Sequence, residues 1–351
     1  MLTTGSHYQL VRPPTSVGVE FKAIAVGSLT SDEIRYAIDQ ACHQRFPLDK
    51  PSLFRVRLFT GLRNTADDQL GLISRCCMLD ADLTPEDSKD SGASEDSDAR
   101  ARRTRRGDVA FNVLVLSCDA IIADFWSMTL LLDDLRTLYQ SASTSETGQY
   151  VLPATPFTYL DYTSYQHAQL SGDLGKQLWA FWQNQLAGAL PVLLLPVDKP
   201  RPAVMSFSAG TRSFRIPRNL TAGLKDLANQ QATTLYTTLL AAFEAFLFRY
   251  THQEDIVIGS VLSCRDDSET HRIMGPFSNP VVFRARMTGN PIFRQYLDDV
   301  RRNVIQVRAH QEFPLALLLE KLGLAGDLAK ADRAPLFQVM FIFGKSAEWS
   351  E

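Results

Sequence analysis

Three polar side chains lie at fixed spacing near residue 120. Within residues 117–138, Asp119, Asp124 and Ser127 read D-x-x-x-x-D-x-x-S. A carboxylate can accept a proton as a general base, and a hydroxyl beside it can donate and accept hydrogen bonds. The spacing therefore predicts an active-site loop, although a solvated corner between a strand and a helix would contain the same residue types.

The segments on both sides of these residues predict a strand and a helix. Residues 109–116, V-A-F-N-V-L-V-L, form an apolar and β-branched run, which is typical of a strand buried on both faces. After the polar corner, apolar residues recur at helical spacing, namely Met128, Leu131, Leu132, Leu135 and Leu138. The polar residues would then occupy a loop between a buried strand and a helix, where α/β proteins often place functional groups.

The composition is that of a globular chain long enough for two lobes. Of its 351 residues, 45% are apolar and 21% are charged. A formal net charge of −3 gives no reason to expect a nucleic acid or an anionic membrane as a partner. We find no N-terminal signal-peptide pattern and no apolar run near the ~18 residues of a membrane span. The five cysteines lack metal-type spacing, so we expect no metal site and a cytoplasmic location.

Strands and helices alternate along the chain, which predicts a mixed α/β protein with two lobes. In the first lobe we expect an extended segment at residues 17–26, a helix at 31–44 and a strand at 53–58. Residues 80–108 contain an acidic, serine-rich block followed by a basic one, without apolar periodicity. These opposite charges predict a disordered, self-neutralising insertion rather than a nucleic-acid patch. Residues 141–150 are expected to form a polar linker.

The second half predicts a helix-rich lobe with several strands. Residues 157–186 have helical spacing that breaks near Ser171-Gly172, and residues 193–202 form a connector rich in proline. The remaining expected elements are strands at 211–216, 255–261, 281–287 and 338–343, the last a closing buried strand, and helices at 221–229, 234–250, 292–310 and 314–322.

Several motifs along the chain occur together in one known family. Residues 119–128 read D-A-I-I-A-D-F-W-S-M, and residues 275–279 read G-P-F-S-N. Further matches are R-F-P-L-D-K-P-S-L-F-R-V-R-L at 45–58, F-W-x-x-x-L-A-G at 181–188, L-P-x-D-x-P-R-P at 195–202, Y-x-x-Q-x-D-I-V-I-G at 250–259 with Arg265, and the segments 310–315 and 333–341. Together these motifs resemble the condensation domains of nonribosomal peptide synthetases, whose H-H-x-x-x-D-G motif often continues W-S-M. The resemblance covers residues 6–344.

This resemblance implies an α/β fold of two chloramphenicol-acetyltransferase-like lobes, arranged as a V-shaped pseudodimer around a tunnel. The implied lobes are residues 1–160 and 161–351. In this family the tunnel admits the phosphopantetheine arms of carrier proteins, and the domain binds no cofactor directly. The implied reaction is attack of an acceptor amine on a donor acyl thioester. The implied partners are peptidyl or acyl carrier proteins and neighbouring synthetase domains, with neither nucleic acid nor membrane.

The resemblance also assigns roles to single residues around the loop. Asp124 would pair with Arg265 and so hold the loop against the second lobe. Trp126 would support the site, although its apolar flanks favour simple packing in the core. Ser127 would be either a catalytic hydroxyl or a helix cap.

The same resemblance predicts the roles of two more residues and a missing segment at the start of the first lobe. Ser260 and Asn279 are expected to line the tunnel, although Asn279 would serve equally to cap the bend before Pro280. An opening helix and strand of the usual domain would precede Met1, so we expect an N-terminally truncated first lobe. A sheet without that strand would expose unpaired backbone groups unless a partner supplies it.

The motif histidines of the family are replaced in this chain. Asp119 stands at the first position, and Ala120 stands at the second, which is usually the catalytic histidine. Alanine cannot accept a proton, and losing a general base typically costs ~10²–10⁴ in rate. Proximity alone can supply an effective molarity of ~10⁵ M or more. We therefore expect impaired or altered amide-forming transfer, or a non-catalytic module that only binds carrier proteins.

A third hypothesis depends on Asp119 together with Asp124 and Ser127. Their pattern is also the signature of the related heterocyclization domains, which condense Cys, Ser or Thr and cyclise the product. Those domains resemble G-D-F-T where this chain has G-P-F-S, so Pro276 replaces the acidic residue of the cyclising pair. Asp119 could act as a base only if it were buried, since burial raises a carboxyl pKa.

Overall fold

The computed structural model describes residues 18–27, 29–48, 52–63, 110–144, 152–203, 209–324 and 333–344. The chain divides into two compact units, residues 1–123 with 345–351 and residues 124–344. The lobe boundary expected near residue 160 and the V-shaped arrangement stay predictions. The insertion predicted at residues 80–108 lies outside the described residues. Among the described helices, we find none that combines the length and apolar character needed to cross a bilayer.

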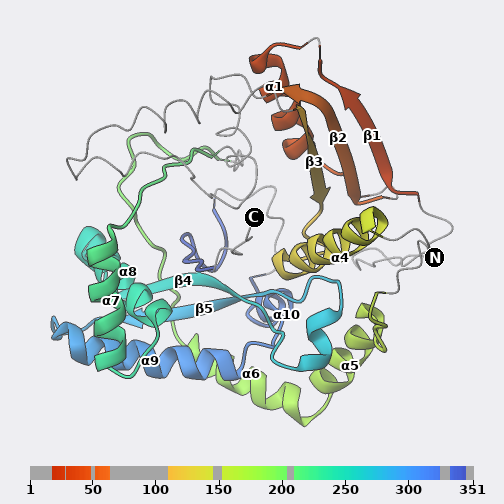
Figure 1. The fold of residues 1–351 in the computed structure, drawn as a ribbon. Coiled ribbons are helices and arrows are strands. Elements are labelled where there is room, and N and C mark those ends of the chain that lie inside the picture. The colour runs from red at the N-terminus through yellow and green to blue at the C-terminus, as the bar shows by residue number, and fades with distance from the viewer. Residues whose placement is uncertain are drawn as a thin grey trace, which may run out of the picture. The chain divides into compact units, whose positions relative to one another are not determined.

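The first unit is built on a three-stranded sheet and a helix. Its described elements are β1 (Glu20–Ala25), α1 (Ser31–His43), β2 (Phe54–Arg63) and β3 (Ala110–Cys118). β1 pairs in parallel with β2, and β3 pairs antiparallel with β2, so β2 lies in the centre (Figure 1). Helix α1 connects β1 to β2 and places Ile34 and Ile38 in one buried cluster with Phe59 and Val113. The extended segment, helix and strand predicted for this region are confirmed.

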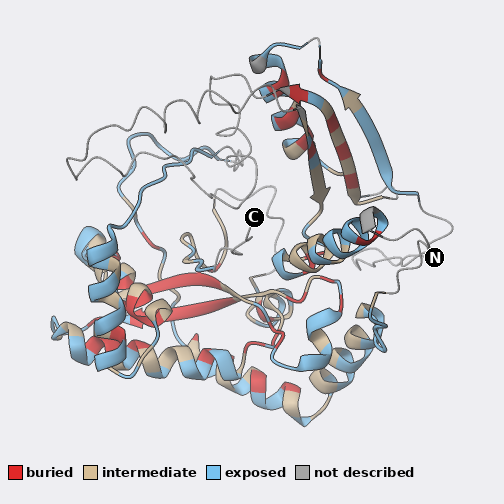
Figure 2. Ribbon diagram, viewed as in Figure 1, coloured by how far each residue is buried: buried red, intermediate tan, exposed pale blue. Residues whose placement is uncertain are grey.

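The prediction that the strand before the candidate loop is buried on both faces is wrong. In β3, Val113 is buried, whereas the next residue, Leu114, is 41% exposed. Successive side chains of a strand point to opposite faces, so only one face of β3 is covered. Strand β1 at the edge of the sheet is also largely exposed, as Figure 2 shows. A nearly unbroken apolar run therefore does not require two covered faces.

The second unit packs helices around a pair of buried strands. Its described helices are α4 (Phe125–Thr144), α5 (Tyr159–Ser171), α6 (Asp173–Gln185), α7 (Arg218–Gln230), α8 (Leu235–Thr251), α9 (Phe293–Ala309) and α10 (Leu315–Lys321), with the 3₁₀ helix η2 (Ser268–Arg272), and its strands are β4 (Asp255–Leu262) and β5 (Asn279–Arg286). β4 and β5 pair antiparallel, with Asp255 opposite Arg286. Trp182, Phe283 and Leu297 are each 1% exposed in the core. The predicted helices are confirmed, including the break near residue 172.

Two predicted strands of the second half are wrong. Residues 211–216 form no regular element, and Phe214 is 85% exposed. The closing strand predicted at residues 338–343 is reduced to a single bridge, in which Met340 lies parallel to Gly259, and Met340 is 41% exposed. Alternating or apolar residues favour a strand, but a ladder forms only where a neighbouring strand offers its free backbone groups.

Helix α4 contains the predicted apolar residues but extends further than expected. It ends at Thr144, so Ser141 belongs to the helix rather than to a polar linker. The Ser141 hydroxyl donates to the carbonyl oxygen of Thr137 at 2.7 Å, one turn earlier. This bond gives the hydroxyl of Ser141, which is 3% exposed, a partner within the helix.

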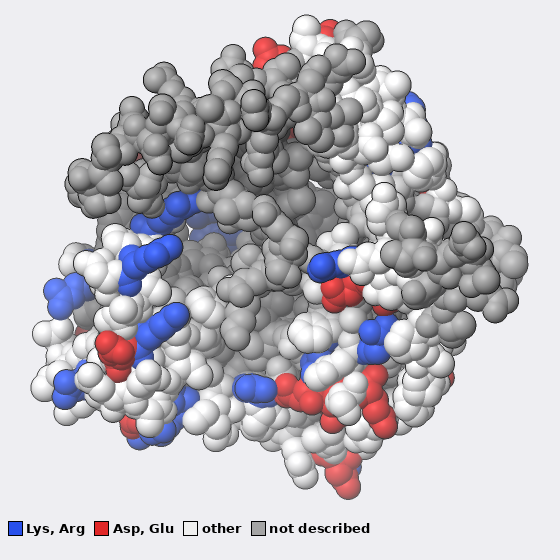
Figure 3. Space-filling view, viewed as in Figure 1, with Lys and Arg blue, Asp and Glu red and all other residues white. Residues whose placement is uncertain are grey.

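Charged side chains of both signs are mixed on the described surface. On the face shown in Figure 3, described Lys and Arg side chains lie among Asp and Glu side chains. On α9, Asp298 pairs with Arg301 at 2.6 Å and with Arg302 at 3.0 Å. Exposed pairs of this kind contribute little to stability, about 0–1 kcal/mol each, so their main effect is to cancel local charge.

Gly175 marks a close contact between α5 and α6, and a side chain there should destabilise the second unit. A Cβ atom at Gly175 would lie 1.9 Å from the carbonyl oxygen of Leu170. We expect Gly175→Ala to lower the free energy of unfolding by about 1–3 kcal/mol, the usual cost of overpacking. Gly223→Ala on α7 is the matched control, because its added Cβ would meet no atom within 4 Å. Urea unfolding of both variants checks this, and equal effects would contradict the packing argument.

Candidate functional site

Asp124 caps the N-terminus of α4. Its Oδ1 accepts a hydrogen bond from the N–H of Ser127 at 2.8 Å, and its carbonyl oxygen accepts one from the N–H of Met128 at 3.1 Å. Aspartate is a favoured cap because its carboxylate satisfies a helix N–H that otherwise lacks a partner. Since Phe125 begins the helix, Ser127 is its third residue, and the prediction of Ser127 as the cap is wrong.

The same carboxylate forms a buried ion pair with Arg265. The two side chains are 4% and 1% exposed, and Arg265 Nη2 lies 3.1 Å from Asp124 Oδ1. The N–H groups of Phe277 and Ser278 donate to Asp124 Oδ2 at 3.2 and 3.3 Å. A buried charge is costly unless it is paired and hydrogen-bonded, and both conditions hold here. The pairing predicted for these two residues is confirmed.

The remaining donors of Arg265 fasten the loop that follows β4. Nη1 donates to the carbonyl oxygens of Thr270 and Ile273 at 2.6 and 2.7 Å, and Nη2 donates to that of Gly275 at 3.1 Å. The guanidinium carbon lies 3.9 Å from the centre of the Phe277 ring, a cation–π contact. One arginine therefore ties this loop to the first turn of α4.

The backbone turns sharply just before Arg265. Cys264 has a φ of 50°, in the left-handed region that non-glycine residues seldom adopt. Its thiol is buried and lies 3.6 Å from the carbonyl oxygen of Gln311. Burial raises the pKa of the Cys264 thiol to about 12, so the thiol stays protonated at neutral pH. Because the thiolate is the nucleophilic form, Cys264 is a structural residue of this turn.

The hydroxyl of Ser127 is fully used inside this network. Ser127 is 0% exposed, and its Oγ accepts hydrogen bonds from the N–H of Gly275 at 2.9 Å and from Arg265 Nη2 at 3.0 Å. Its single proton faces Asp124 Oδ1 at 2.8 Å and the carbonyl oxygen of Gly275 at 2.9 Å. A hydroxyl has one donor and two acceptor positions, and all three are occupied. The hydrogen bonds of Ser127 therefore connect the first turn of α4 to the loop that contains Gly275.

Gly275 is required where this loop meets the start of α5. A Cβ atom at Gly275 would lie 2.2 Å from the ring of Tyr159. Tyr159 donates to the carbonyl oxygen of Pro276 at 3.2 Å, and its ring meets that of Phe277 edge-on. Burial and the nearby charge of Asp124 raise the pKa of Tyr159. The structure thus explains two residues of the G-P-F-S-N motif. Gly275 is needed because the ring of Tyr159 approaches closely, and Phe277 contacts both Tyr159 and Arg265.

Trp126 does not pack in the core, which corrects the packing prediction. Its side chain projects from the first turn of α4, and the residue is 42% exposed. The indole N–H donates to the carbonyl oxygen of His271 at 2.8 Å, and the two rings lie 5.5 Å apart. His271 Nε2 in turn forms a hydrogen bond with the carbonyl oxygen of Arg265 at 2.8 Å. Sequence reasoning missed His271, whose only signal is its place six residues after Arg265.

Asp119 and Ala120 belong to the first unit, at the end of β3. The Asp119 N–H donates to the carbonyl oxygen of Leu53 at 2.9 Å, which prolongs the pairing of β3 with β2. Asp119 Oδ1 accepts from the N–H of Ile121 at 3.0 Å, a turn that aspartate favours. Ala120 is exposed. The structure thus gives Asp119 a local structural bond, while its predicted catalytic role stays a prediction.

Ser260 and Asn279 are both fastened by hydrogen bonds within the second unit. Ser260 is 1% exposed, and its hydroxyl donates to the carbonyl oxygen of Phe341 at 2.7 Å. Asn279 Nδ2 donates to the carbonyl oxygens of Gln311 and Phe313, both at 2.7 Å. Its Oδ1 accepts from the N–H of Leu315, the first residue of α10, at 3.1 Å. Asn279 therefore secures the turn before α10 rather than the bend before Pro280, and the tunnel-lining roles stay predictions.

Five of the residues predicted for the site fall into two groups. Asp124, Ser127, Arg265 and Trp126 converge at the start of α4 in the second unit, whereas Asp119 lies in the first unit. The converging group positions a loop and offers no unengaged base. Within the described ranges, no three His, Cys, Asp or Glu side chains are placed to hold a metal ion.

Comparison with known proteins gives a consistent family. A family model of the condensation domain matches residues 109–349. A linear gramicidin synthase of Brevibacillus parabrevis is 40% identical over 230 residues, which are 66% of this chain and 3% of that protein. A plipastatin synthase of Bacillus subtilis (strain 168) is 38% identical over 231 residues, 66% of this chain and 9% of that protein. The chain thus spans a small part of the curated relatives it matches.

The similarity extends to solved structures. The X-domain from teicoplanin biosynthesis has a TM-score of 0.69 with 23% identity, covering 92% of this chain and 61% of that one. The same X-domain has been solved in complex with OxyB. This likeness shows the condensation-domain fold, with its chloramphenicol-acetyltransferase-like α/β architecture. The family match, its relatives and the fold agree, and the chain belongs to the condensation-domain family of nonribosomal peptide synthetases.

Proposed function

We propose that this chain is a condensation scaffold that binds acyl or aminoacyl thioesters on carrier proteins but lacks the family's histidine base. One observation carries the proposal. The network of Asp124, Ser127 and Arg265 that fixes the motif loop is complete, whereas Ala120 occupies the position of the catalytic histidine. A scaffold that has lost its fold would not keep a buried, fully hydrogen-bonded ion pair. The phosphopantetheine arm of each carrier protein would bring its thioester to the chain, which would act in the cytoplasm.

Without a base, the chemistry depends on how the two thioesters are held. The acceptor amine must lose a proton as it attacks the donor carbonyl, and Ala120 has no group to receive it. An α-amino group has a pKa near ~7.7–8, so part of it is neutral at pH 7 and can attack unaided. Proximity can supply ~10⁵ M of effective concentration, while the missing base costs about 10²–10⁴ in rate. The expected transfer is therefore slow compared with that of a domain that has its histidine.

A second candidate function is recruitment of a partner enzyme without transfer. It is favoured by Ala120 together with the likeness to the X-domain, which forms a complex with OxyB. Heterocyclization has less support. Of its three signature residues, Asp124 and Ser127 are engaged with Arg265 and with each other, and Asp119 Oδ1 is engaged with Ile121.

Intact-protein mass spectrometry of loaded carrier proteins tests the proposal. A donor-loaded and an acceptor-loaded carrier protein are mixed with and without this chain. A slow mass gain on the acceptor equal to the donor acyl group supports base-free condensation, and the same gain less one water would instead support heterocyclization. Carrier binding without transfer would support recruitment. If neither carrier protein binds, the proposed function is wrong.

Restoring the missing base should increase transfer. We expect Ala120→His to raise the single-turnover rate about 100-fold, because an imidazole at this position can accept the amine proton. Ala120→Gln is the matched control, since it adds a polar side chain of similar size with no basic nitrogen. The measurement is the rate of mass transfer to the acceptor carrier protein. An equal response of the histidine and glutamine variants would show that the missing base does not limit the reaction.

A further inference from the structure

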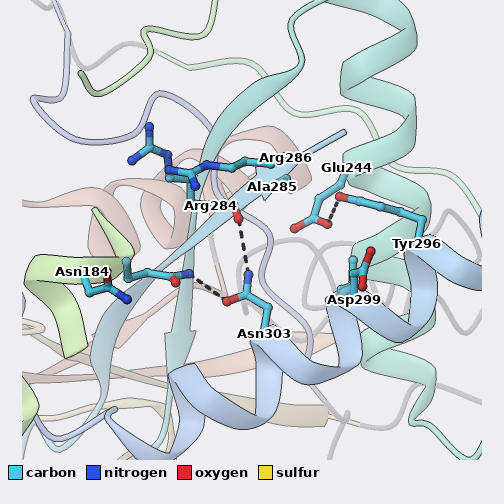
Figure 4. A pocket seen from close by; sticks show the side chains of 10 residues that line it. Asn184, Glu244, Arg284, Ala285, Arg286, Tyr296, Asp299 and Asn303 are labelled. Atoms are coloured by element: carbon cyan, nitrogen blue, oxygen red, sulfur yellow. Dashed lines mark hydrogen bonds between the residues drawn. The ribbon is translucent and has the colours of Figure 1, made fainter. Parts of the chain in front are cut away.

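A cavity in the second unit lies outside the motif network. It has a volume of about 400 Å³ and lies between the end of α6, helix α8, strand β5 and helix α9 (Figure 4). Glu244 and Tyr296 form its buried floor, and Asn184, Arg286 and Asp299 form its exposed rim. Its volume falls within the range of small-molecule sites, about 300–1,000 Å³.

The floor contains a carboxylate with an unsatisfied oxygen. Glu244 is 1% exposed, and its Oε2 accepts a hydrogen bond from the Tyr296 hydroxyl at 2.6 Å. Its Oε1 is buried and accepts no hydrogen bond from any described residue. In Figure 4 this second oxygen faces away from Tyr296, toward the interior of the cavity. A buried acceptor without a donor is costly, so this oxygen marks the place where a ligand donor would be most favourable.

The charged groups around the cavity do not neutralise Glu244. The guanidinium of Arg284 is used by Asp255 at 2.7 Å and by the carbonyl oxygens of Ala187 and Ala189 at 2.7 and 3.0 Å. On α9, Asp299 adds a second carboxylate at the rim, where it pairs with Arg302.

The amide groups of the wall are hydrogen-bonded to protein groups. Asn303 Oδ1 accepts from Gln185 Nε2 at 2.8 Å, and Asn303 Nδ2 donates to the carbonyl oxygen of Arg284 at 3.5 Å. Both polar atoms of the Asn303 amide therefore have partners, whereas Glu244 Oε1 has none. The cationic side chain of Arg286 lies at the exposed rim. An anion would meet the buried carboxylate of Glu244 here, whereas a cation with N–H donors would complement it.

We propose that this cavity binds a small molecule through a primary ammonium group, which donates a hydrogen bond to Glu244 Oε1. A metal ion is disfavoured, because the described residues place no three metal-ligating side chains together. A neutral alcohol could donate one hydrogen bond but would not compensate a carboxylate charge. Burial raises the pKa of Glu244 to about 7. A bound ammonium group would favour the ionised form of Glu244, because a nearby opposite charge stabilises a carboxylate.

Thermal unfolding of the full chain with n-propylammonium chloride tests this site. At pH 8 and a concentration about ten times the dissociation constant, we expect the melting temperature to rise by about 2 °C. 1-Propanol, which has the same length and no charge, should have no such effect. Glu244→Gln should abolish the rise while keeping an acceptor for Tyr296. Asp173→Asn at the start of α6 is the matched control, because Asp173 pairs with Lys176 outside the cavity and should leave the rise unchanged.

A measurement on the wild-type chain keeps the test independent of any variant. Calorimetric titration with n-propylammonium at pH 6 and pH 8 should show affinity rising about tenfold, because Glu244 ionises over this range while the alkylamine, with a pKa near ~10.4, stays charged. Equal stabilisation by 1-propanol, binding retained in Glu244→Gln, or an affinity unchanged between the two pH values would each overturn the proposal.

Discussion

Replacing Asp124 with alanine is expected to lower the free energy of unfolding by about 3–5 kcal/mol, the usual cost of leaving one member of a buried ion pair alone. The cost is high because Arg265 is 1% exposed at its side chain and cannot turn toward water. The same carboxylate caps α4 and accepts the N–H groups of Phe277 and Ser278, so those bonds are lost together with the pair.

Denaturant unfolding of the full chain, with a matched exposed pair as control, measures this effect. Asp134 pairs with Arg272 at 2.8 Å, but their side chains are 27% and 42% exposed. Asp134→Ala should therefore cost no more than about 1 kcal/mol. Asp124→Asn should fall between the two, since an amide oxygen can still cap the helix but cannot balance the guanidinium charge. If Asp124→Ala costs no more than Asp134→Ala, the network does not hold this loop.

The pairing of Asp124 with Arg265 could be predicted from the sequence because both residues lie in recognisable motifs. The rest of the network could not. Gly275 is required by the ring of Tyr159, and Trp126 is held by a backbone carbonyl at His271. These partners lie more than a hundred residues apart in the chain, and no spacing rule connects them. Contacts of this kind depend on tertiary packing, which local patterns do not encode.

The incorrect predictions have a related cause. Trp126 has apolar neighbours in the sequence, which favour a position in the core. At the first turn of α4, however, Trp126 is partly exposed, and its indole N–H donates to the carbonyl oxygen of His271. Residues 211–216 alternate like a strand, yet Phe214 remains exposed. Strand β3 is mostly apolar although only one face is covered. In each case the residue types favour the predicted structure, but the outcome depends on neighbours that lie far away in the sequence.

The burial of Glu244 also could not be predicted from the sequence, and it is expected to make the stability of the protein depend on pH. The sequence A-A-F-E-A-F-L-F places one carboxylate in an apolar helix, and only the fold reveals that it is buried beside Tyr296. Burial raises the pKa of Glu244 from 4.5 to about 7, and the Tyr296 hydrogen bond acts in the opposite direction. Between these two values the folded protein binds more protons than the unfolded chain, so its stability falls as the pH rises.

Glu244→Gln should remove this pH dependence. A side chain that cannot ionise has no charge to bury, so the unfolding free energy of the variant relative to the wild type should rise by about 3 kcal/mol between pH 4.5 and pH 8. Denaturant unfolding at several pH values measures this difference. Tyr296→Phe should have the opposite effect, because losing the bond that lowers the pKa of Glu244 widens the range over which stability falls. Parallel pH profiles for the wild type and Glu244→Gln would mean that Glu244 does not ionise within the folded protein, and its carboxylate would then be unavailable to an ammonium ligand.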